Sequence, residues 1–129
     1  MARTKPRKIK ESGHSSDFLK IAHRIMNAAL QHKAHQLRAY DVRGLTLIAD
    51  SFVICSAMSE PQMKAIRNAV IESMSDIGRH PLHAEGEANS AWLVLDYGDV
   101  IFHLFRAEAR EYYDLDGLWG DAPQVDFPQ

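Results

Sequence analysis

The sequence predicts a single α+β domain, in which a mixed sheet of about five strands packs with two long helices and a short C-terminal helix. Apolar residues recur at helical spacing in two long segments. The strand-like segments are short, rich in β-branched and aromatic residues, and bounded by turn residues. The chain of 129 residues suffices for one ordinary domain and is too short for two.

The first helix is expected to begin after Ser15 and Ser16, which are good N-cap residue types. An apolar stripe at i, i+3, i+4, i+7 spacing then predicts a helix of about 18 residues, and it consists of Phe18, Ile21, Ala22, Ile25, Met26, Ala29 and Leu30. Residues 39–42 predict a strand that ends in a turn at Arg43 and Gly44, and residues 52–55 predict a buried strand.

The second helix has a clear start signal. Ser59 can cap it, Gln62 stands three residues further on as in a capping box, and Pro61 is tolerated in the first turn. Met63, Ile66, Val70, Met74 and Ile77 supply its apolar stripe. Gly78 is a natural C-terminal stop.

A strong hairpin signal follows a short strand-like piece at residues 82–85. Residues 92–96 and 100–105 flank a turn made of Tyr97, Gly98 and Asp99. A short helix at residues 107–113 precedes the C-terminal tail, so the predicted order is α-β-β-α-β-β-β-α. We expect a basic, disordered leader (1–15), one domain (16–121) and a flexible tail (122–129).

The two hairpin strands are apolar on both faces. Regular alternation places one set of side chains on each face, the first being Leu93, Leu95, Val100, Phe102 and Leu104, and the second Trp92, Val94, Ile101, His103 and Phe105. Either one long helix covers each face, or one face stays partly open and forms a partner site. The sequence leaves both alternatives open.

Charge is distributed unevenly along the chain. Residues 1–10 carry five basic side chains and no acid, so the other residues hold 10 basic and 17 acidic side chains, a formal charge of −7. An acidic body argues against a DNA- or RNA-binding domain and suits a basic protein partner. The leader could still contact RNA or direct the chain to an organelle.

Composition excludes several other classes. No apolar run approaches the length of a membrane span, and the first residues lack the apolar core of a secretory signal. The lone Cys55 excludes an internal disulfide framework and suits a reducing cytosol. We therefore expect a cytoplasmic protein without a membrane partner or a specific DNA partner.

The sequence contains no convincing catalytic motif. The two His-x-x-His pairs (His32 with His35, His80 with His83) lack the companions of a zinc site. No glycine-rich nucleotide loop is present, and Asp50 is followed by Ser51 and Phe52, so the second acid of an Asp-x-Asp pair is missing. We expect a protein that is not an enzyme and that needs no metal or cofactor.

Three blocks follow one another along the sequence. The opening block is Asp-Val-Arg-Gly-Leu-Thr at 41–46 with Ala-Asp-Ser-Phe-Val-Ile at 49–54. The central block is residues 92–103, and the closing block is 110–115 with Leu-Trp-Gly-Asp-Ala-Pro at 118–123. Together, in this order, the blocks resemble the ribosomal silencing factor family (RsfS, also called Iojap or YbeB). Ser51, Glu60 and Pro61 depart from the commoner family pattern, away from the central and closing blocks.

The resemblance implies a binding protein that docks on the large ribosomal subunit through large-subunit ribosomal protein fourteen. The bound factor would block joining of the small subunit and repress translation when nutrients are short. The implied fold is similar to that of nucleotidyltransferases without their catalytic carboxylates. The expected partner-binding residues are Trp92, Tyr97, Asp99, His103, Phe105, Arg110 and Tyr113, with the aromatic residues as anchors. An active metal-dependent nucleotidyltransferase and a self-associating, homodimeric adaptor are the alternatives.

Overall fold

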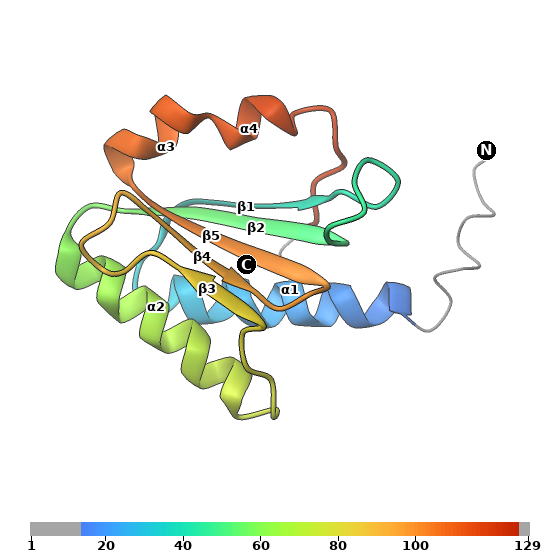
Figure 1. Cartoon of the computed structure of the whole chain (residues 1–129), viewed down its shortest axis with the longest axis horizontal. Coiled ribbons are helices and arrows are strands. Elements are labelled where there is room, and N and C mark those ends of the chain that lie inside the picture. The colour runs from blue at the N-terminus through green and yellow to red at the C-terminus, as the bar shows by residue number, and fades with distance from the viewer. Residues whose placement is uncertain (1–13, 127–129) are drawn as a thin grey trace.

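The computed structural model describes residues 14–126, which form one five-stranded sheet with helices on both faces (Figure 1). The predicted α+β class and element order are confirmed. One further short helix, α4, follows the expected C-terminal helix. The elements are α1 (His14–Leu30), β1 (His35–Asp41), β2 (Ser51–Ala57), α2 (Glu60–Ser75), β3 (His83–Glu85), β4 (Trp92–Asp96), β5 (Val100–Arg106), α3 (Ala107–Tyr113) and α4 (Leu115–Leu118).

The sheet has the order β1-β2-β5-β4-β3. Its two central strands, β2 and β5, run parallel, and the other neighbouring pairs are antiparallel. Every residue of β2 is buried, as are all of β5 except Arg106. Central strands covered on both faces have nearly continuous apolar sequences, which explains why both strands were recognisable.

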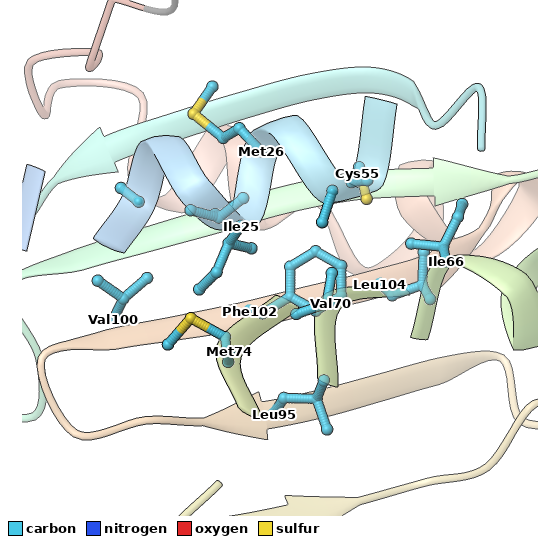
Figure 2. Packing of buried hydrophobic residues seen from close by; sticks show 14 of the residues in the cluster. Ile25, Met26, Cys55, Ile66, Val70, Met74, Leu95, Val100, Phe102 and Leu104 are labelled. Atoms are coloured by element: carbon cyan, nitrogen blue, oxygen red, sulfur yellow. The ribbon is translucent and has the colours of Figure 1, made fainter. Parts of the chain in front are cut away.

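Both long helices lie on the same face of the sheet, so the alternative with one long helix on each face is wrong (Figure 1). Ile25 and Met26 of α1 and Val70 and Met74 of α2 pack with the first hairpin set, including Phe102 (Figure 2). These five side chains are between 0% and 2% exposed. This face holds the larger apolar core.

The start of α2 shows the predicted cap. The Gln62 backbone N–H donates to the Ser59 hydroxyl oxygen at 3.2 Å, and the Met58 N–H donates to the Gln62 side-chain oxygen at 2.7 Å. The first bond satisfies a backbone donor that the first helical turn leaves free, and the second ties the residue before the cap to that turn. The helix ends at Ser75, and Gly78 takes the left-handed conformation expected just after a helix (φ 77°).

The opposite face is covered by α3, α4 and the segment that follows them (Figure 1). The Asp41 N–H donates to the Pro123 carbonyl, and the Val125 N–H donates to the Ala39 carbonyl. Residues 122–126 therefore run along β1, whereas the sequence predicts a flexible tail from residue 122. The predicted disordered leader falls almost entirely outside the described residues. Among the described residues, no helix is both long and apolar enough to cross a membrane.

Candidate docking site

An apolar groove of about 380 Å³ lies on the face of the sheet that the long helices leave free. We call it the aromatic groove. Its floor comes from β2, β4 and β5, one side from α4 and the residues after it, and another from the loop before β2. Polar residues of β3 and β4 stand at its rim. The lining residues are Ile48, Phe52, His83, Glu85, Trp92, Val94, Asp96, Ile101, His103, Leu115 and Trp119.

Trp92 is the central aromatic residue of this face. Its ring stacks on Phe105 with the centroids 4.9 Å apart and the planes inclined by 25°. Tyr113 of α3 lies 4.9 Å from the same ring. Aromatic contacts of this kind hold a side chain in one orientation and contribute about 0.5–1.5 kcal/mol each. Trp92 is therefore a preorganised, partly exposed apolar surface.

His103 lies in the floor of the groove and is 8% exposed. The Trp92 indole N–H donates to His103 Nδ1 at 3.2 Å. Because an indole nitrogen can only donate, Nδ1 is the acceptor and the neutral ring carries its proton on Nε2. Burial lowers the pKa of His103 to about 4, so the imidazole is neutral at physiological pH. The groove floor is thus uncharged.

Several lining residues were not predicted from the sequence. Phe52 packs edge to face against both His103 and Trp119, with centroid distances of 5.2 Å. Leu115 and Ile48 complete the walls. Phe52 and Trp119 belong to the opening and closing blocks of the family resemblance, so the resemblance could have indicated them as site residues. The contribution of Ile48 depends on a loop conformation that no periodicity reveals.

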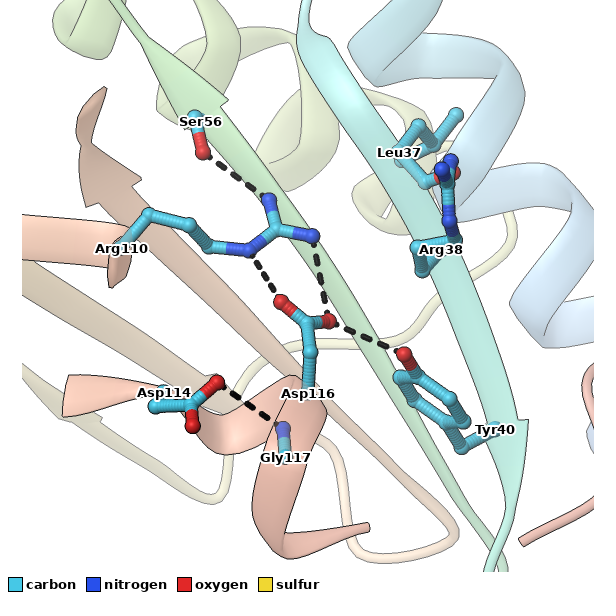
Figure 3. Close-up of polar contacts among 8 residues, drawn as sticks. All are labelled: Leu37, Arg38, Tyr40, Ser56, Arg110, Asp114, Asp116 and Gly117. Carbon is cyan, nitrogen blue, oxygen red and sulfur yellow. Dashed lines mark hydrogen bonds and ion pairs between the residues drawn. The ribbon is translucent and has the colours of Figure 1, made fainter. Parts of the chain in front are cut away.

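Arg110 holds α4 in place instead of standing at an exposed edge, which corrects the sequence-based expectation. Its side chain is 6% exposed and makes a bidentate ion pair with Asp116 at 2.6 and 3.2 Å (Figure 3). It also donates to the Ser56 hydroxyl, and the Tyr40 hydroxyl donates to Asp116 (Figure 3). Burial alone would raise the pKa of Asp116, but the hydrogen bonds and charge of Arg110 outweigh burial and lower it. This network fixes one wall of the groove.

The other predicted residues divide between the exposed surface and the interior. Tyr113 is 46% exposed and lies beside Trp92, outside the lining of the groove. Phe105 is fully buried beneath Trp92, so it supports that ring and offers no exposed surface. Tyr97 is 3% exposed and packs in the core beneath α1 and α2, where burial raises its pKa to about 12. Tyr97 and Phe105 are therefore not exposed anchors, because the turn and the sheet place their rings inside.

Asp99 lies outside the groove. Its carboxylate accepts a hydrogen bond from Arg79 at 2.7 Å in an ion pair, and its backbone carbonyl accepts from the Asp50 N–H. Asp50, Asp99 and Arg79 line a separate hollow with Asp17 and Lys20 of α1. Within residues 14–126, no three histidine, cysteine, aspartate or glutamate side chains converge as metal ligands would. In this hollow, the two acids that precede β2 and β5, Asp50 and Asp99, therefore lie together with the basic side chains of Lys20 and Arg79.

The fold defines a single α+β domain, and one face of its sheet carries a preformed apolar groove with a polar rim. A family model described as "Ribosomal silencing factor during starvation" matches residues 15–129. The chain belongs to this family, as the three sequence blocks predict.

Relatives in bacteria and plants agree with this assignment. A ribosomal silencing factor of Halalkalibacterium halodurans is 40% identical over 112 residues, which cover 87% of this chain and 93% of the relative. A chloroplastic Iojap protein of maize (Zea mays) is 31% identical over 92% of this chain and 51% of its own length. A crystal structure of a Chromobacterium violaceum protein superposes with a TM-score of 0.75 at 26% identity, covering 85% of this chain and 88% of that one.

Proposed function

We propose that this protein silences translation by docking on large-subunit ribosomal protein fourteen through the aromatic groove, so that its body blocks joining of the small subunit. Family membership supports ribosome-associated translation silencing. The single observation that favours the groove as the contact is its preformed aromatic surface around Trp92. Buried aromatic anchors within a polar rim are typical of the residues that dominate binding energy at interfaces.

The charge around the groove favours a basic partner. Glu85 and Asp96 stand among the lining residues. The segment 107–126, which forms α3, α4 and the chain after them, holds six acidic residues and one basic residue, Arg110. Because Arg110 is already paired with Asp116, this side presents mainly negative charge to a partner. Complementary charge speeds encounter with a basic ribosomal protein and disfavours acidic competitors.

The proposed mechanism is steric exclusion and involves no chemical step. A contact of about 800 Å² on each partner is the usual size for a stable complex and fits on one face of a domain this small. Occupancy then depends on the concentration of the factor relative to its dissociation constant. The proposed location is the cytoplasm, or the organelle whose ribosomes the protein serves.

Sucrose-gradient sedimentation tests the proposal directly. The protein is added in excess to purified large subunits before small subunits are mixed in. We expect it to migrate with the large subunit and the joined-ribosome peak to shrink. Protein that stays at the top of the gradient while joining proceeds normally would contradict the proposal. Crosslinking to ribosomal protein fourteen then identifies the contacted protein.

Self-association is the second candidate, because an apolar groove could also be filled by a second copy of the chain. One face cannot serve both contacts at once. Analytical ultracentrifugation of the protein with and without isolated ribosomal protein fourteen separates the cases. A dimer that dissociates as the partner is added shows that both use this face, whereas a dimer that persists beside bound partner places self-association elsewhere.

A further inference from the structure

The loop between β1 and β2 presents apolar side chains to solvent beside the aromatic groove. Leu47 is fully exposed, and Leu45 and Ile48 are 55% and 62% exposed. Ile48 also lines the groove, so the loop and the groove form one continuous surface. Large apolar side chains gathered in this way on a small domain indicate an interaction surface.

Hydrogen bonds hold the loop in one shape. The Val42 N–H donates to the Asp50 carbonyl at 2.9 Å and closes its base. Arg43 forms a bidentate contact with the Asp41 carboxylate at 2.9 and 2.7 Å, and its guanidinium lies 4.6 Å from the centroid of the Phe18 ring. At the tip, the Ile48 N–H donates to the Thr46 hydroxyl oxygen. A preorganised apolar tip binds at a smaller entropic cost than a flexible one.

The charge of the chain decides between two occupants of this surface. Residues 107–126, which lie on this face, hold six acidic side chains and one basic side chain, so two copies brought together through this face would place like charges opposite each other. A partner with basic side chains around an apolar hollow matches both the acidic surroundings and the exposed leucine. That is the chemistry required of the ribosomal protein in the proposed function.

We propose that residues 45–48 are a second part of the docking surface, with Leu47 inserted into an apolar hollow of the same basic ribosomal protein that occupies the aromatic groove. This inference rests on the proposed function. The groove and the loop then contact the partner as one extended surface. An extended contact fixes the partner's orientation, which steric exclusion of the small subunit requires.

Binding of the full chain to purified large subunits, measured by pelleting, tests this inference with Leu47→Asp and Leu47→Met. We expect the aspartate to weaken binding at least about tenfold and the methionine to stay close to wild type. Because Leu47 touches nothing in the core, thermal unfolding should be unchanged. The matched control is Leu82→Asp: Leu82 is 76% exposed, precedes β3 and does not line the groove, so it should bind normally.

Each contrary result has a distinct meaning. Wild-type protein that does not pellet with the subunit overturns the proposed function, and the loop contact with it. Wild-type protein that pellets, with Leu47→Asp pelleting equally well, overturns the loop contact alone. A Leu47→Asp variant that loses self-association in ultracentrifugation but keeps subunit binding assigns the loop to a second copy, which also overturns the inference.

Discussion

The two faces of the sheet differ in their side chains and in how fully helices cover them. The face beneath α1 and α2 is closed by aliphatic side chains together with Phe18, Tyr97 and Phe102, and its central residues have essentially no exposure. The opposite face is rich in aromatic rings, is covered only in part by two short helices, and keeps a groove of about 380 Å³. Its cover is held by the Arg110–Asp116 ion pair as well as by apolar packing. The first face stabilises the fold, and the second is the docking face in the proposed function.

The largest expected effect is on the closed face. Phe102→Ala removes a fully buried ring beneath α1 and α2 and should lower the free energy of unfolding by about 3–5 kcal/mol, because the rigid surroundings cannot fill the cavity. Urea denaturation followed by circular dichroism measures it. Tyr112→Ala, at an 81% exposed position on the other side, is the control and should change stability little. Equal losses from the two substitutions would contradict the division of roles.

The next effect concerns pH and the groove floor. The folded chain keeps His103 neutral down to a pKa of about 4, whereas the unfolded chain protonates it near its ordinary value of 6.5. Between these values the unfolded state binds more protons, so the free energy of unfolding should fall as the pH drops, by up to about 3 kcal/mol from this residue. Above pH 6.5 the residue adds no pH dependence.

Urea denaturation at several pH values between 4 and 8 measures this slope. The His103→Gln variant has no titrating ring and should show a flatter curve over the same range. A variant curve parallel to that of the wild type would show that His103 titrates normally and is not enclosed by the groove.

A smaller effect is expected for Trp92, the partly exposed aromatic residue of the groove. Trp92→Ala should weaken large-subunit binding by about 2 kcal/mol, or about thirtyfold, because it removes the central apolar surface of the groove. Its partial exposure means that the fold should survive with a modest loss of stability. Pelleting titrations and a thermal melt are run on the same sample. Unchanged affinity would remove Trp92 from the docking surface, and an unfolded variant would assign it to the core.

The sequence predicted the regular parts of this division better than the irregular ones. Alternation along β4 and β5 correctly separated Leu93 and Phe102 from Trp92 and His103, because strand periodicity follows from backbone geometry alone. It did not reveal that both long helices share one face, since periodicity says which side of a helix is apolar but not where the helix packs.

The composition of the proposed docking site was harder to predict. Arg110 looked like a free cation because its partner, Asp116, lies on a helix of four residues that gives no periodic signal. Tyr97 was expected to be an anchor because it is an aromatic residue in the central block of the family resemblance, whereas its ring packs in the core beneath α1 and α2. Such placements depend on tertiary packing, which a local pattern does not contain.

The smallest effect is expected at Asp99, and it tests whether the partner contacts only the face that carries the aromatic groove. Asp99 forms a partly exposed ion pair with Arg79 and lies in the hollow beside α1, away from the aromatic groove. Partly exposed pairs contribute about 0–1 kcal/mol, so Asp99→Asn should cost little stability and leave subunit binding within about twofold of wild type. The measurement is the same pelleting titration, with Trp92→Ala as the variant that does respond. If Asp99→Asn weakens binding as strongly as Trp92→Ala, the partner also reaches the α1 side of the sheet, and the docking surface extends beyond one face.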